Sequence, residues 1–516
     1  MNLLNSIVRS LTTDFESSRP LSVCAVFSPR KFKITQHSST HRHREMMDVV
    51  VRRGAPPSSS SSYAANDSRF SLANKMHGQY FQLYYSRFRA LAPRVREACT
   101  EAFGPGVPQR TVLELVEGER CVVIGTLYKD MRLKPIILDE YVKDYDKSAV
   151  KTLEKYTRDD DRLELEDESA RLKLVNIDAA PFVTGVVVGC VGKAIKGDFV
   201  VEDTVVFAPA NVQGKTTKPV SAAADDEPTF VCLVSGFEIG EDDSDAAVRN
   251  QMFVDYITGA SVDDDDARVS GKISRVIVAG GMLKQSLATT DVVDASASKP
   301  ANGHTADANG TAAAASARTR SLKELDMMLA ELVSAVPVDV MSGKSDPSNQ
   351  AMPQQPLHPV YFPEASRYEQ TLNTVTNPHE FTIDQPMFLG TSGQNIADVM
   401  KFSDIGDTIS GGAFRGDDAA KRAVSALSAT LRWQHIAPSA PDTLACYPFK
   451  DRDPFVMDTT PHVYFAGCQE AFGYERVTHP NGGETVVISV PKFCATGTAV
   501  LVNTSTLEVS PLTFEC

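Results

Sequence analysis

The chain has 516 residues, of which 42% are hydrophobic and 23% charged, and its formal net charge is −14. At roughly 150 residues per domain, this length predicts about two to four domains with sizeable apolar cores. Tight, autonomous binding to nucleic acid needs a basic surface against the phosphates, so the acidic balance disfavours that class of function.

The cysteines and the apolar runs indicate in which cellular compartment the protein would be stable. The nine cysteines include no C-x-x-C pair, and several lie inside apolar runs such as Val187–Val191. This pattern disfavours a zinc ribbon and suits reduced, buried thiols in an intracellular compartment. No apolar run reaches about 18 residues, so no transmembrane helix is expected.

The N-terminal region is polar and precedes a helical pattern. Residues 1–68, with the run Ser58–Ser62, predict a disordered tail. An Arg- and Ser-rich leader is also compatible with a transit peptide, or with an extension upstream of a start at Met46 or Met47. A helical segment is predicted over residues 69–110, because apolar residues recur there at spacings of three and four. Pro93 is expected to break or kink it.

Residues 111–215 have the shorter period of strands. The strand-like runs are 122–127, 163–168, 171–174, 182–191 and 198–207. Five or so strands within about 100 residues, with internal glycines where a strand could bend sharply, predict a small closed barrel of the OB type.

Residues 226–516 alternate strands with helices, which predicts a layered α/β domain. Strands are expected at 230–235, 274–279, 335–341, 485–490 and 498–502. A helix is expected over 322–334, with Ser321 as its N-cap and Glu324 completing a capping box. The Ala-, Ser- and Asn-rich tract at about 289–320 predicts a disordered insertion.

Strands that end in Gly-containing turns are typical of metallophosphoesterases, whose loops carry Asp-x-His, Gly-Asp, Gly-Asn-His-Asp/Glu and Gly-His-x-His ligands. A two-metal site needs several converging oxygen and imidazole ligands. The corresponding loop positions here are Ser235, Gly236, Gly280, Gly281, Gly343, Asp346 and Gly467. One acid cannot hold two metals, so we predict no catalytic residue, no metal and no cofactor. Asp346, which precedes Pro347, is interpreted as a turn or cap residue.

Other polar residues are interpreted as structural. His358, His379, His435 and His462 lack ligand spacing. Residues 391–395 follow a strand-like run and could form a phosphate-binding nest. A tight turn whose polar side chains satisfy its backbone is the favoured interpretation.

Longer motifs carry a family resemblance. They are Gln354–Pro359, Thr376–Pro378, Phe388–Asn395, Ala440–Phe449 and Pro461–Phe465. Over about residues 70–510 the chain resembles the accessory B-subunits of eukaryotic DNA polymerase delta. The resemblance implies an α+β multidomain fold: an OB-type β-barrel packed on an inactivated calcineurin-like phosphoesterase α/β sandwich.

The resemblance also implies a non-catalytic scaffold in nuclear DNA replication and repair synthesis. The implied partners are the metal-binding C-terminal domain of the polymerase delta catalytic subunit and a third accessory subunit. The sliding clamp and DNA are reached indirectly, and no membrane is involved. Three alternatives remain: a B-subunit of polymerase alpha or epsilon, an OB-fold single-strand binder, and a weakly active metallophosphoesterase. The barrel strands are poor in aromatic residues and residues 159–161 are acidic, which disfavours strand binding.

Overall fold

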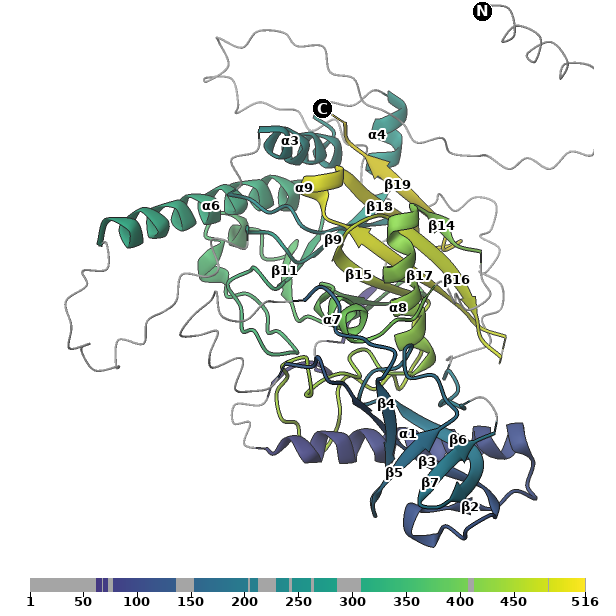
Figure 1. The fold of residues 1–516 in the computed structure, drawn as a ribbon. Coiled ribbons are helices and arrows are strands. Elements are labelled where there is room, and N and C mark those ends of the chain that lie inside the picture. Colours follow the sequence, from purple (N-terminus) through teal and green to yellow (C-terminus); the bar gives the residue numbers. More distant parts are fainter. Residues whose placement is uncertain are drawn as a thin grey trace, which may run out of the picture.

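The computed structural model describes residues 62–66, 68–72, 78–135, 153–202, 205–211, 229–240, 244–260, 264–284, 308–406, 413–480 and 482–515. Figure 1 shows a small β-barrel beneath a larger layered body, with helix α1 running along the barrel. Within these ranges no helix is both long and apolar enough to cross a membrane.

Helix α1 (Tyr80–Phe103) confirms the predicted helical pattern. Its buried face carries Leu83, Leu91 and Val95, which pack against the barrel or the neighbouring body. Pro93 lies inside the helix and does not end it. Because the proline side chain is on the exposed face, the missing N–H costs one backbone hydrogen bond and leaves the buried stripe intact.

The barrel is closed, as predicted. Its strands run in the order β3-β4-β5-β7-β6, and β6 pairs back onto β3, while β2 adds to β3 in parallel. Gly125 lets β4 approach closely, because a Cβ there would lie 2.4 Å from Leu165 Cδ2. The strands are β2 (Gln109–Arg110), β3 (Arg120–Asp130), β4 (Arg162–Glu166), β5 (Arg171–Val175), β6 (Val187–Ile195) and β7 (Asp198–Val201).

The larger body contains two mixed sheets. The six-stranded sheet has the order β11-β10-β9-β8-β18-β19, in which β8 to β11 are parallel. Its strands are β8 (Phe230–Val234), β9 (Ile273–Ala279), β10 (Val338–Met341), β11 (Leu372–Val375), β18 (Thr498–Asn503) and β19 (Val509–Thr513).

The seven-stranded sheet has the order β1-β12-β13-β15-β17-β16-β14. Its strands are β1 (Tyr63–Ala65), β12 (His379–Ile383), β13 (Met387–Thr391), β14 (Arg415–Gly416), β15 (Val463–Gln469), β16 (Gly473–Thr478) and β17 (Glu484–Pro491). The strands expected at 485–490 and 498–502 are therefore confirmed as β17 and β18.

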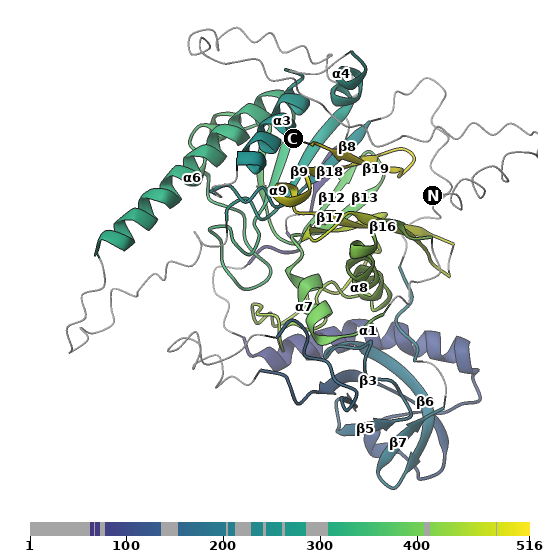
Figure 2. The same cartoon turned by 45° about the horizontal axis from the view of Figure 1, so that its top comes forward.

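The two sheets stack face to face, and helices cover both outer faces (Figures 1 and 2). Ile277 and Phe465 belong to the apolar core between the sheets. Helices α3 (Ser244–Thr258) and α6 (Ala308–Ala335) cover the six-stranded sheet. Helices α7 (Gln394–Phe402) and α8 (Lys421–Arg432) cover the seven-stranded sheet on the side of the barrel.

Short elements complete the fold. The short helices are α4 (Asp264–Gly271) and α9 (Phe493–Thr496), and the 3-10 turns are η1 (Val112–Glu114), η2 (Pro359–Tyr361), η3 (Ala365–Arg367) and η4 (Asp418–Ala420).

The predicted tail ends earlier than expected. Tyr63–Ala65 forms β1, which pairs antiparallel with β12 at the edge of the seven-stranded sheet. The Tyr63 hydroxyl donates to Asp339 Oδ2 at 2.9 Å, and the Arg275 guanidinium lies over the Tyr63 ring. The prediction of disorder up to residue 68 is therefore wrong for this strand, and residues 1–61 lie outside the described part.

Helix α6 begins earlier than predicted. It starts at Ala308, so Ser321 is not its N-cap; the Ser321 hydroxyl donates to the Ala317 carbonyl inside the helix. The prediction of a disordered insertion is wrong for residues 308–320, and the tract from 289 to 307 lies outside the described residues. Alanine is the best helix former, so the alanine-rich tract extends the packed helix that follows it.

Candidate functional site at the strand ends and the domain junction

The loops that follow neighbouring strands meet at one end of the sandwich, and all seven candidate loop positions belong to this loop cluster. The Gly236 N–H donates to the Gly280 carbonyl at 2.9 Å. A Cβ on Gly343 would lie 2.5 Å from the Gly281 nitrogen, and one on Gly467 would lie 3.0 Å from Ser235 Cβ. The close approach leaves no room for side chains, which is why glycine occupies these positions.

Asp346 is the acid at the centre of the loop cluster. Its Oδ2 accepts from the N–H groups of Gly281 (2.9 Å) and Gly343 (2.7 Å). Its Oδ1 accepts from those of Met282 (2.9 Å) and Leu283 (3.1 Å). Asp346 therefore lies in a turn, as predicted, and in addition ties the loop after β10 to the loop after β9.

The surroundings of Asp346 restrict the reactions in which its carboxylate can take part. Burial raises the pKa of Asp346 to about 6, although the four backbone N–H donors act in the opposite direction. Four hydrogen bonds occupy the lone pairs of a carboxylate, so none remains for a metal ion. In the described part of the chain, no group of three or more His, Cys, Asp or Glu side chains could hold a metal.

The possible nucleophiles nearby are engaged or inert. The Ser235 hydroxyl donates to the Pro491 carbonyl at 3.0 Å and accepts from the Cys468 N–H at 2.8 Å. Burial, and secondarily the charge of Asp346, raises the pKa of the Cys468 thiol to about 12. A thiol that stays protonated at neutral pH is a poor nucleophile.

Neutral amide side chains form the other wall of the loop cluster. Asn377 Nδ2 donates to Gln354 Oε1 (2.8 Å) and to Gln394 Oε1 (3.0 Å), and Gln354 Nε2 donates to the Gly343 carbonyl (3.1 Å). The Ser392 N–H donates to Asn377 Oδ1 at 3.1 Å. Our sequence reasoning missed this network, although each of these amide side chains lies in one of the family motifs.

The turn at 391–395 differs in detail from the expectation. It is a turn that leads into α7, with Gly393 at φ +92°. The side chains of Ser392 and Gln394 form hydrogen bonds with the side chains of Asn377 and Gln354, which belong to other motifs. The expectation was that these polar side chains would satisfy the backbone of the turn itself. The turn therefore serves to join the motifs.

The four predicted structural histidines lie in different places. His358 Nδ1 accepts from the Val360 N–H, and His462 Nδ1 accepts from the Met387 N–H. His379 stacks on Phe381 within the sandwich. His435 belongs to the junction between the barrel and the sandwich.

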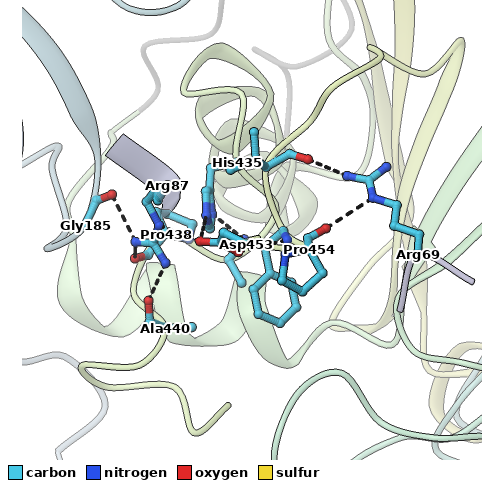
Figure 3. A network of polar contacts seen from close by, with 11 residues as sticks. Arg69, Arg87, Gly185, His435, Pro438, Ala440, Asp453 and Pro454 are labelled. Carbon is cyan, nitrogen blue, oxygen red and sulfur yellow. Dashed lines mark hydrogen bonds and ion pairs between the residues drawn. The ribbon is translucent and has the colours of Figure 1, made fainter. Parts of the chain in front are cut away.

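That junction is organised around Arg87 of α1, whose side chain is completely buried (Figure 3). Its Nε donates to Asp453 Oδ2 at 2.8 Å. Its terminal nitrogens donate to the carbonyls of Gly185 (3.1 Å) in the barrel, and of Pro438 (2.7 Å) and Ala440 (2.6 Å) after α8. One guanidinium thus joins α1, the barrel and the sandwich.

His435 completes the network as a neutral ring. Its Nε2 donates to Asp453 Oδ2 at 2.9 Å and its Nδ1 accepts from the Ala437 N–H at 3.2 Å. Burial, reinforced by the positive charge of Arg87, lowers the pKa of His435 to about 4. Burial alone would raise the pKa of Asp453, but His435 and Arg87 hold it well below its usual range.

Lys129 of β3 is a second residue that forms hydrogen bonds with both the barrel and the sandwich. Its buried ammonium donates to the carbonyl of Phe182 in the barrel (3.1 Å) and to that of Phe402 in α7 (3.0 Å). Asp161 lies 3.7 Å away. Burial lowers the pKa of Lys129 to about 8. The side chains of Lys129 and Arg87 are both fully buried, so the barrel and the sandwich form a continuous packed unit.

Comparison with known proteins agrees with this architecture. The family model "DNA polymerase delta subunit OB-fold domain" matches residues 79–204, which contain α1 and the barrel. The family model of the DNA polymerase alpha/epsilon B-subunit matches residues 231–474 of the sandwich. Fold and matches together define a polymerase B-subunit with an OB-fold domain.

Full-length relatives narrow the family. The DNA polymerase delta small subunit of Oryza sativa subsp. japonica is 36% identical over 461 residues, which cover 88% of this chain and 97% of the relative. The DNA polymerase delta small subunit of Arabidopsis thaliana is 37% identical, over 88% of this chain and 96% of the relative. The DNA polymerase delta small subunit of Saccharomyces cerevisiae is 31% identical, over 83% of this chain and 88% of the relative. The chain belongs to the family of DNA polymerase delta small subunits.

Proposed function

We propose that this chain is a non-catalytic scaffold of a DNA polymerase delta complex in the nucleus. It would dock the metal-binding C-terminal domain of the catalytic subunit and a third accessory subunit. The sliding clamp and DNA would be reached through these partners. Such a scaffold acts by raising effective concentration and fixing geometry.

The observation that carries the proposal is the state of Asp346. Asp346 is the one acid among the candidate loop positions. Its carboxylate oxygens accept four hydrogen bonds from backbone N–H groups, which leaves no lone pair for a metal ion. Together with the buried hydrogen bonds at the junction, this supports a rigid platform. We infer that the sandwich is an inactivated calcineurin-like phosphoesterase, and that the chain divides into a helical segment at 69–110, an OB domain at 111–215 and a phosphoesterase-like domain from 226.

The direct test is purification of the tagged full chain from its own cells at moderate salt, with mass spectrometry of what co-purifies. We expect a polymerase delta catalytic chain in near-equal amount, retained after nuclease treatment. Recovery with a polymerase alpha or epsilon catalytic chain would favour those complexes. Recovery alone, or only with partners that nuclease removes, would contradict the proposal.

The phosphoesterase alternative has its own assay. Hydrolysis of bis(p-nitrophenyl) phosphate by the purified chain with Mn²⁺ should stay at the level of the buffer blank. Mn²⁺-dependent hydrolysis that the Asp346→Asn variant abolishes would show retained catalysis and overturn the non-catalytic assignment.

A further inference from the structure

A cavity of about 590 Å³ opens between the barrel and α8, away from the loop cluster. Its barrel side includes Asp178, Phe182 and Phe207, and its α8 side includes Ser425, Arg432 and Trp433. Pockets of this size at domain junctions, apolar with a few polar groups, are typical of small-molecule sites.

One buried polar group on the α8 side lacks a hydrogen-bond partner in the described part of the chain. The Ser425 side chain is 2% exposed, and its hydroxyl has no hydrogen-bond partner within the described residues. The indole N–H of Trp433, which is not itself buried, also has no hydrogen-bond acceptor among the described residues. An unsatisfied buried group is costly, so its persistence calls for a ligand or an ordered water.

Charge selects the kind of ligand. Arg432 is exposed at the end of α8 and makes no ion pair with any residue that the structure describes. Asp178 is the acid on the barrel side, and its Oδ1 accepts from the Ala180 N–H. The α8 side therefore presents a cation and two hydrogen-bond donors, which suit an anionic group, and keeps it away from Asp178.

The remaining wall suits an aromatic body. The rings of Phe182 and Phe207 lie 6.5 Å apart at a tilt of 39°. Trp433, on the opposite side, is the single tryptophan of the chain. Aromatic side chains bind planar rings through offset stacking and edge-to-face contacts.

We propose that this cavity binds a small planar aromatic anion, with its ring against Phe182, Phe207 and Trp433 and its anionic group at Arg432 and Ser425. The cavity shares no lining residue with the loop cluster, and its binding test needs no partner subunit, so the proposal stands or falls independently of the proposed function.

The test uses the full chain and 1-anilinonaphthalene-8-sulfonate, an aromatic sulfonate, as probe. Because Trp433 is the only tryptophan, excitation of it should transfer energy to a probe bound in this cavity. We expect saturable binding of one probe per chain, with quenching of Trp433 emission. Trp433 emission that stays unchanged at saturating probe would overturn the proposal.

Variants locate the bound probe. Ala429→Phe should fill the cavity and weaken binding at least tenfold, and Arg432→Gln should weaken it at least fivefold. Arg422→Gln makes the same charge change on the same helix, outside the cavity wall, and should change affinity less than twofold. Thermal unfolding shows whether each variant is folded. Equal weakening by both arginine changes, or unaltered binding in a folded Ala429→Phe chain, would show that the probe binds elsewhere and that water alone occupies the cavity.

Discussion

Asp346 and His435 show at the residue scale how burial changes what a titratable group does. Each is fully buried and each has a pKa moved toward its neutral form, to about 6 for Asp346 and about 4 for His435. Asp346 remains an acceptor for backbone N–H groups, whereas His435 remains a donor to Asp453. Asp346 therefore holds the backbone of the loops around it in place, and His435 holds the side chain of Asp453 in place.

Replacing Asp346 by Asn should destabilise the loop cluster. One oxygen that accepts N–H bonds would become an NH₂ group facing donors, and we expect the free energy of unfolding to fall by about 2–4 kcal/mol. Chemical denaturation at pH 7 measures this. Asp451→Asn, at an exposed aspartate, is the matched control and should change little. An equal effect of the two changes would contradict the anchoring role.

The pH dependence of stability should report His435. Its pKa is about 4 in the folded chain against an ordinary 6.5, so the unfolded chain takes up a proton first as pH falls. The stability linked to this ring is complete above about pH 6.5 and decreases toward pH 4, by roughly 3 kcal/mol. Asp346, whose folded pKa is raised, acts with the opposite sign between about pH 4 and pH 6.

The His435→Gln variant isolates this contribution. The difference in unfolding free energy between the wild type and this variant should shrink as pH falls from 6.5 to 4. The Val360→Ala variant, at an exposed residue without a titratable side chain, should show a difference that does not change with pH. A His435 difference that is also independent of pH would mean that folding leaves the pKa of this ring unchanged.

At the scale of elements, α1 belongs to neither domain alone. Its Leu83 packs in the core shared with α7 and α8, while its Val95 packs against the barrel strands. Arg87 lies between them and binds carbonyls on both sides. The helix therefore fixes the position of the barrel relative to the sandwich.

Arg87→Lys should loosen this junction. Lysine keeps the charge but cannot reach Asp453 and three carbonyls in the fixed geometry of a guanidinium. We expect a loss of about 3–5 kcal/mol, as for a broken buried ion pair. Hydrogen exchange should rise at 182–186 and 436–441 before it rises in the sheets. Arg89→Lys, on the exposed face of α1, serves as control; matching exchange profiles would count against the junction role.

At the scale of the whole molecule, distant parts of the chain complete each other's layers. Strand β1, near the start of the described chain, adds to a sheet whose other strands come from residues after 378. Strand β18, near the C-terminal end, pairs with β8. These long-range pairings make the sandwich dependent on both ends of the described chain.

Two truncations test this dependence. Removing residues 1–61 leaves every contact between described residues in place, so this variant is the reference for the second truncation. Removing residues 1–66 also deletes β1, exposes the edge of β12 and removes the Tyr63–Asp339 hydrogen bond. We expect a lower midpoint and more aggregation in that variant. Identical midpoints would show that β1 contributes nothing to the sheet.

The sequence by itself determined the elements with strong local periodicity and the membership of the loop cluster. The sequence predicted the strand of Val122–Leu127, the helix after Ser321, and strands at 230–235 and 274–279, which the structure places at 230–234 and 273–279. These elements could be predicted because side-chain period and apolar runs are local properties. The presence of Ser and Gly at the predicted loop positions was equally visible in the sequence.

Only the tertiary structure decided the starts of β1 and α6, the four donors on Asp346 and the burial of Arg87. An edge strand of three residues and an alanine-rich helical extension depend on a neighbour that supplies hydrogen bonds or packing. The role of a polar side chain depends in the same way on which distant carbonyl or N–H group the fold brings to it. Local sequence does not encode that proximity, and for this reason the amide network and the junction were found only in three dimensions.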